Sequence, residues 1–167
     1  MPTLILTIVG PDRPGLVRTL SEALAARGGN WLESRMARLG GQFAGIVMVD
    51  APDSFPADLA GLEAEGFRIT VAAAGGGAAV VGPLLVVEVT GNDRPGIVHE
   101  VTRVLAAHGA NIEDMTTNVS SGAFSGEALF RAAIVLRAPD EKAVAALTAG
   151  LERISNDIMV DVRPAEG

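Results

Sequence analysis

The loop sequence GPDRPGLV at Gly10–Val17 returns as GNDRPGIV at Gly91–Val98. When Gly10–Asn30 is aligned with Gly91–Asn111, eleven of the twenty-one positions are identical. Self-similarity of this kind at a fixed spacing indicates a duplicated structural module. The 167-residue chain is therefore expected to contain the same fold twice.

The residues around each loop predict what the module is. A β-rich run ends at Gly10 and at Gly91, and the apolar residues after each loop are spaced three and four apart, which predicts a helix with one apolar face. Gly28 and Gly109 are expected to end these helices. Two extended runs follow, and Gly40-Gly41 between them predicts a tight hairpin in the first copy. A second helix, over residues 55–66 in the first copy, and a closing strand complete the unit. Each copy is thus predicted to be a ferredoxin-like βαββαβ unit of the α+β class, an antiparallel sheet with its helices on one face.

The low-complexity stretch AAAGGGAAVVGP separates the two copies. Glycines flanked by alanines favour a flexible connection, so residues 75–82 are predicted to be a linker. The predicted domains are residues 1–74 and 83–167. A phosphate-binding loop is excluded here, because no Gly-Lys-Ser/Thr follows the glycines.

Charge and composition narrow the classes of function. The net charge is −7, and Lys142 is the single lysine. Because nucleic-acid binding depends on clusters of lysine and arginine that neutralise phosphates, direct binding of nucleic acid is not expected. No apolar run reaches the roughly 18 residues that a membrane-spanning helix needs, and the N-terminus resembles a strand rather than a signal peptide. The expected location is the cytoplasm, with no membrane partner.

The sequence contains few of the residues and patterns that a metal, cofactor or catalytic site needs. Cysteine is absent, which removes thiolate ligands and thiol nucleophiles. His99 and His108 are nine residues apart in one predicted helix, so they face opposite ways. Neither a Ser-His-Asp order nor a carboxylate pair beside a phosphate loop is present. The sequence predicts a protein that is not an enzyme and has no cofactor and no metal site.

The DRPG loop can place an anion site beside a hydrogen-bond acceptor. A helix start leaves backbone N–H groups unpaired and carries partial positive charge, which favours a carboxylate. Pro14 and Pro95 are expected in the first helical turn, where the missing N–H has no partner to lose. Gly15 and Gly96 lack a Cβ, so a ligand or a second backbone can approach closely.

Two roles are open to Asp12 and Asp93. Each carboxylate could cap its helix by accepting the N–H of Gly15 or Gly96. Alternatively, it could hold the ammonium group of a bound amino acid whose carboxylate faces the helix start. The residues alone do not decide between these roles.

The neighbouring polar residues have ordinary structural explanations as well. Asn30 and Asn111 follow the first helix of each copy, where asparagine is a common turn residue. Arg13 and Arg94 are loop residues that could pair with an acid of a facing module.

A βαββαβ unit whose first strand runs into DRPG, with GGNW or GANI after the helix, resembles the ACT domain. The string GGNWLESRMARLGGQFAGIVMV is similar to the first domain of glycine cleavage system transcriptional repressor-like proteins, which are tandem ACT proteins. ACT domains are regulatory modules that sense amino acids or other small metabolites. The resemblance implies that Asn30 and Asn111 can contact the amino acid from across an interface between modules. The predicted ligand-binding residues are Asp12, Arg13, Gly15, Leu16, Asn30, Asp93, Arg94, Gly96, Ile97 and Asn111.

The resemblance implies a non-enzymatic regulator that binds a small amino acid, with glycine as the expected ligand. Such a regulator acts on a protein partner, for example a transcriptional regulator that controls amino-acid metabolism, and a homodimer is compatible with the sequence. The alternative is a ligand-free interaction scaffold of ACT domains, whose sheet edges bind partners.

The two copies also differ in their hairpins. Gly40-Gly41 in the first copy is replaced by the longer Ser120–Gly126 in the second. Extra serine and glycine favour a mobile lid or a partner-binding loop. If the loop has such a role, the two sites are not equivalent.

Overall fold

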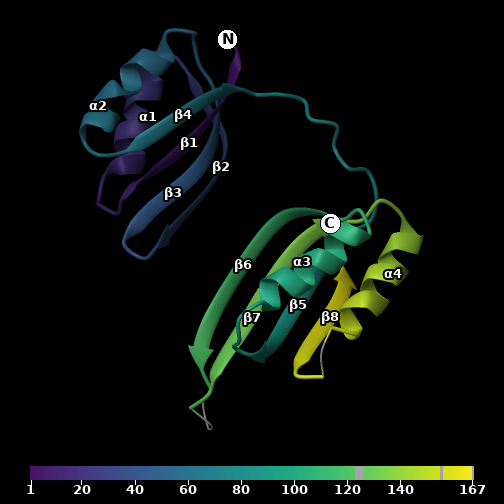
Figure 1. Ribbon diagram of the computed structural model, residues 1–167. Coiled ribbons are helices and arrows are strands. Elements are labelled where there is room, and N and C mark those ends of the chain that lie inside the picture. Colours follow the sequence, from purple (N-terminus) through teal and green to yellow (C-terminus); the bar gives the residue numbers. More distant parts are fainter. Residues whose placement is uncertain (123–125, 155, 167) are drawn as a thin grey trace. The chain divides into compact units, whose positions relative to one another are not determined.

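The computed structural model describes residues 1–122, 126–154 and 156–166. The chain divides into two compact units, Met1–Gly77 and Ala78–Gly167, and each contains one DRPG loop (Figure 1). The division falls inside segment 75–82, the predicted linker, which carries neither helix nor strand.

The first unit is a four-stranded antiparallel sheet with its helices on one face (Figure 1). The strand order is β2-β3-β1-β4. In chain order the elements are β1 Thr3–Pro11, α1 Leu16–Ala26, β2 Asn30–Leu39, β3 Gln42–Asp50, the 3₁₀ helix η1 Phe55–Leu59, α2 Ala60–Ala64 and β4 Arg68–Ala73.

The second unit repeats this topology, with strand order β6-β7-β5-β8. Its elements are β5 Leu84–Asn92, α3 Ile97–Ala107, β6 Asn111–Ser121, β7 Ala128–Arg137, α4 Glu141–Glu152 and β8 Ile158–Pro164. The predicted pair of α+β, βαββαβ units is therefore confirmed. Within the described ranges, no helix is long and apolar enough to cross a membrane.

Alternation along the central strands decides which sheet face meets the helices. β1 and β5 share one pattern, in which every second residue is buried. Because successive strand side chains point to opposite faces, the buried residues of each strand lie on the helix side. These residues are Leu4, Leu6 and Ile8 in β1 and Leu85, Val87 and Val89 in β5.

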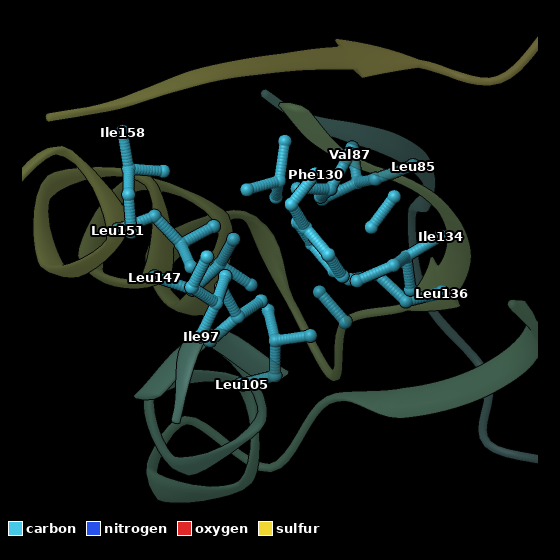
Figure 2. Packing of buried hydrophobic residues seen from close by; sticks show 14 residues of the cluster. Leu85, Val87, Ile97, Leu105, Phe130, Ile134, Leu136, Leu147, Leu151 and Ile158 are labelled. Atoms are coloured by element: carbon cyan, nitrogen blue, oxygen red, sulfur yellow. The ribbon is translucent and has the colours of Figure 1, made fainter. Parts of the chain in front are cut away.

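Figure 2 shows the core of the second unit, where side chains of both helices point toward the sheet. Ile97 and Leu105 come from α3, and Leu147 and Leu151 come from α4; they converge with Ile134 of β7. All five are almost completely buried. Full burial of such a side chain contributes about 1.5–3 kcal/mol, so this layer fixes α3 against the sheet.

The core of the first unit is closed by a shorter second helical segment. The predicted helix over 55–66 is divided into η1 and the five-residue α2. Pro56 near its start and Gly61 within it both have low helix propensity. Phe55 and Leu62 are nonetheless buried, so the segment still covers the sheet. Trp31 and Met36 of β2 are partly buried and pack against this core.

The two hairpins differ in length. Gly40 and Gly41 have φ of 58° and 78°, the pair of positive values that a two-residue hairpin turn requires, which confirms the predicted tight hairpin. In the second unit Ser120 and Ser121 belong to β6 rather than to a loop. The remainder of the loop predicted over Ser120–Gly126 includes residues 123–125, which lie outside the described residues.

Each sheet also has an outer face, which we define as the face away from the helices of the same unit. The cross-strand register places Ile5, Val9, Ala44, Ile46 and Met48 on the first outer face. On the second outer face, the residues in the corresponding positions are Val86, Thr90, Arg131, Ala133 and Val135, and Glu88 replaces Thr7. On the two central strands, the outer face is thus mostly apolar in the first unit, whereas in the second it carries Glu88, Thr90 and Arg131.

Candidate ligand site at the two DRPG corners

We call residues 12–16 the first DRPG corner and residues 93–97 the second. In each, a central strand ends and a helix begins one residue after a glycine. Gly15 and Gly96 are the N-cap residues, with φ of 95° and 93°, and neither helix has a side-chain cap. The capping role considered for the two aspartates is therefore wrong. So is the expectation that the prolines occupy the first helical turn, because the helices start two residues after them.

Gly15 and Gly96 are needed for their backbone conformation and not for close packing against another group. A Cβ at Gly15 would meet no atom within 4 Å among the described residues, and at Gly96 it would meet Glu100 Oε1 at 3.8 Å. The left-handed conformation of both glycines strongly disfavours other residues. This sharp turn lets the DRPG loop end directly at the unpaired N–H groups of the helix start.

The first corner is closed by contacts within its own unit. The Asp12 carboxylate accepts a hydrogen bond from Nε of Arg38, which lies on β2. Arg13 pairs with Glu65, and its guanidinium lies 5.1 Å from the ring centroid of Phe67. Both charged residues of this loop are thus already engaged.

The second corner is fixed by a different set of contacts. Arg94 makes a fork to Glu100, with Nη1–Oε1 and Nη2–Oε2 both 2.9 Å, and its Nε lies 3.2 Å from Oδ2 of Asp157. Hydrogen bonding to Glu100 raises the pKa of the Arg94 guanidinium, and the same bonding to Arg94 lowers the pKa of Glu100. The arginine therefore stays charged and positions the loop.

Asp93 is the polar group left available at this corner. Its backbone N–H donates to Ala128 O at 2.8 Å. Its carboxylate forms no ion pair or hydrogen bond with any residue that the structure describes. A hollow of about 380 Å³ opens beside it, lined by Asp93, Arg94, Gly96, Ile97, Val98, His99, Val119 and Phe130.

One strand position explains why the corners differ. In the first unit, Arg38 pairs in register with Phe43, and Phe43 pairs with Gly10. In the second unit, Val119 pairs with Phe130, which pairs with Gly91. Val119 therefore stands where Arg38 stands, and it brings no cation to the aspartate.

The predicted asparagines lie elsewhere in each unit. Asn111 is in the register row of Leu84, whereas the loop leaves the other end of β5 at Asn92. Eight residues of strand separate these rows, roughly 27 Å. Asn30 is likewise in the row of Thr3, at the far end of β1. A contact from either asparagine to a ligand needs another module and stays a prediction.

The remaining predicted residues have clear positions. Leu16 and Ile97 are buried core residues, and Ile97 also forms a wall of the hollow.

Arg38 and Val119 were not among the predicted site residues, although alignment of the two strands after each helix could have paired them. No group of three or more metal-ligating side chains occurs among the described residues.

A family model for the ACT domain matches residues 2–65 and 83–164. The chain belongs to the ACT domain family. Each match contains one DRPG corner; the first extends from β1 through α2, and the second includes all the elements from β5 to β8.

Two solved structures match the ACT chain over nearly its whole length. A crystal structure of an unknown protein from Galdieria sulphuraria is 31% identical, with a TM-score of 0.88 and 99% of each chain covered. A protein provisionally named as a glycine cleavage system transcriptional repressor is 18% identical, with a TM-score of 0.68 and coverage of 99% of this chain and 98% of that one. The second likeness shows the fold. No curated protein matches the chain.

Proposed function

We propose that this tandem ACT protein is a non-enzymatic regulator that binds a small amino acid at its second DRPG corner. The observation that carries this proposal is the carboxylate of Asp93, which has no partner among the described residues and lies beside a hollow of about 380 Å³. A zwitterion needs an acceptor for its ammonium and donors for its carboxylate, and this corner offers both within one turn of chain.

In the proposed complex the ligand ammonium donates to Asp93. The ligand carboxylate faces the first N–H groups of α3, which have no partner within the helix and lie at the positive end of its dipole. Arg94 keeps its fork to Glu100 and holds the loop in place. Val98 and Val119 line the same hollow, so a ligand without a charged side chain fits it, and glycine is the simplest such ligand.

The first corner is proposed to be unable to bind the same ligand. Arg38 donates to Asp12, where the ligand ammonium would otherwise donate. A ligand must break this ion pair before it can use the carboxylate. The two copies are thus proposed to have divided into a binding corner and a closed corner.

The regulated process is proposed to be transcription, through a protein partner. The likeness to a protein provisionally named as a glycine cleavage system transcriptional repressor supports this direction. The chain carries a net charge of −7 with one lysine, which disfavours direct contact with DNA phosphates. The effect on DNA would therefore pass through another protein.

Titration calorimetry with glycine, alanine, serine and glutamate tests the proposal on the full chain. We expect saturable heat with at least one of the small uncharged amino acids. Asp93→Asn should lose a charge-assisted hydrogen bond worth about 1.5–3 kcal/mol. Asp12→Asn is the matched control and should leave the affinity unchanged, because Asp12 is already held by Arg38.

Two results would contradict the proposal. Equal losses in both aspartate variants would mean that the corners work alike. The absence of heat with every amino acid would favour a ligand-free scaffold, for which the apolar first outer face, with Ile46 54% exposed, is the supporting observation.

A further inference from the structure

The second outer face contains a hollow that is separate from the DRPG corner. It has a volume of about 430 Å³ and is lined by Glu88, Val89, Thr90, Thr116, Asn118, Arg131, Ala132 and Ala133. Thr116, Ala133 and Glu88 form one register row across three strands. The small Ala133 side chain between two longer ones leaves the space.

Arg131 is the cation of this hollow, and it has no partner within the described part of the chain. Three other arginines of the second unit have carboxylate partners: Arg94 with Glu100, Arg137 with Glu113 and Arg163 with Glu88. A guanidinium presents a planar fork of donors that matches a carboxylate. Arg131 is therefore free to make such a fork to a bound molecule.

Neutral polar groups surround this guanidinium. Asn118 and Thr90 lie directly across from Arg131 on the neighbouring strands, and Thr116 lies one pleat further along β6. None of these three side chains has a hydrogen-bond partner among the described residues. Together they can donate to and accept from a small polar molecule.

The carboxylate of the hollow does not compete for Arg131. Glu88 is held by Arg163 through two contacts, Nη1–Oε2 at 3.0 Å and Nη2–Oε1 at 3.1 Å. Hydrogen bonding to Arg163 lowers the pKa of Glu88, so this group stays ionised. It therefore offers an acceptor in the register row next to that of Arg131 on this face.

We propose that this hollow is a second ligand site, which binds a small monocarboxylate that also carries a hydroxyl or amino group. The ligand carboxylate pairs with the fork of Arg131, Asn118 and the threonines bond its neighbouring oxygens, and its donor reaches Glu88. A volume of about 430 Å³ is in the range of ligand pockets, which run from about 300 to 1,000 Å³. A ligand with several negative charges is disfavoured by Glu88 and by Asp161, which both contact Arg163.

The first unit supplies an internal negative control. The position of Arg131 is taken there by Ala44, and that of Asn118 by Ala37. Ile46 stands in the place of Ala133 and would fill the space. The corresponding face of the first unit therefore lacks counterparts of Arg131 and Asn118, and its Arg35, in the register row of Ile46, pairs with Glu33.

An amide NMR titration of the full chain tests the proposal, with sodium glycolate as the probe and sodium chloride at equal ionic strength as the reference. Glycolate should shift the amide signals of Thr116, Asn118, Arg131 and Ala133 in a saturable way. Arg131→Gln should weaken this binding by about tenfold or more. Arg103→Gln, an exposed charge change on α3, is the matched control and should leave it unchanged.

A second variant tests the space in the hollow separately from the charge of Arg131. Ala133→Ile should abolish the glycolate shifts while it keeps Arg131 and copies the first unit. Preserved signal dispersion shows that each variant is folded. The proposal is overturned if glycolate produces no saturable shift here, or if Arg131→Gln binds it as the parent does. Signals of Asp93 and Val119 report the DRPG corner separately, so this outcome does not depend on the proposed function.

Discussion

The two DRPG corners have the same loop sequence and the same backbone, but they expose different chemistry. In the first, Arg38 pairs with Asp12; in the second, Val119 takes the place of Arg38, and Asp93 lies beside a hollow with no partner in the described part of the chain. The difference comes from a strand residue more than twenty positions away from the motif. A DRPG motif therefore positions the backbone for ligand binding. The residue that faces it on the neighbouring strand decides whether the aspartate carboxylate is available to a ligand.

The largest effect should follow from making the second corner like the first. Val119→Arg places a guanidinium beside Asp93 and should weaken amino-acid binding by roughly 100-fold, since it removes a charge-assisted hydrogen bond to the ligand. Calorimetry measures the loss. Val119→Thr, which adds no charge, is the control and should stay within a few-fold of the parent. Unchanged affinity in Val119→Arg would show that Asp93 does not hold the ligand.

The reverse exchange should open the first corner. Arg38→Val frees the Asp12 carboxylate, and we expect the calorimetric stoichiometry to rise from one ligand per chain toward two. Arg35→Val, on the same strand but without contact to Asp12, should leave one site. If Arg38→Val still binds one ligand, the first corner is closed by something other than this ion pair.

Because the two corners have the same backbone geometry, substitutions that disturb it should destabilise the protein to a similar extent. Gly15→Ala and Gly96→Ala each force an L residue into the left-handed region, which costs about 1–2 kcal/mol. Chemical denaturation should show a similar loss of stability for both. Gly61→Ala is the control, because Gly61 lies in α2 with open space at its Cβ position, and it should be neutral or slightly stabilising. Markedly unequal losses in the two corners would mean that their turns differ.

Features that depend on a single stretch of chain could be predicted from the sequence, whereas contacts between separate segments could not. The duplication and the β-rich runs of β1 and β5 predicted both sheets, and Gly40-Gly41 predicted its hairpin. The helix start was placed too early, because Pro14 is favoured at a first helical position, whereas the glycine after it can adopt the left-handed N-cap.

The site was harder because its deciding contacts are between segments. Asp12 has the same sequence neighbours whether it caps a helix, meets Arg38 or holds a ligand. Only the register of β2 on β3 brings Arg38 to it, and register is a tertiary property. The predicted ligand contact of the asparagines also depends on separate segments, because each asparagine begins a strand at the far end of the sheet and needs another module to reach a ligand.

The smallest expected effect concerns Glu100, which has Thr19 as its counterpart in the first unit. Its pKa lies below the ordinary 4.5, chiefly because it is hydrogen-bonded to Arg94. Folding therefore favours the ionised form, so its contribution to stability is present above pH 4.5 and is lost as pH falls through the folded-state pKa.

Melting curves against pH can detect this contribution. Glu100→Gln should melt below the parent at neutral pH, and the gap should narrow as the solution is acidified past 4.5. Glu63→Gln in the first unit controls for the loss of one negative charge. A gap that widens on acidification would contradict the assignment.

The separate hydrophobic cores have a consequence for how this protein could have changed after its duplication. The buried cluster of each unit draws its residues from that unit alone. A substitution at one corner, such as valine against arginine on the facing strand, therefore leaves the packing of the other copy untouched. The core of one unit therefore sets no limit on substitutions at the corner or on the outer face of the other. The two copies can therefore be compared directly, because each serves as the reference for the other within one chain.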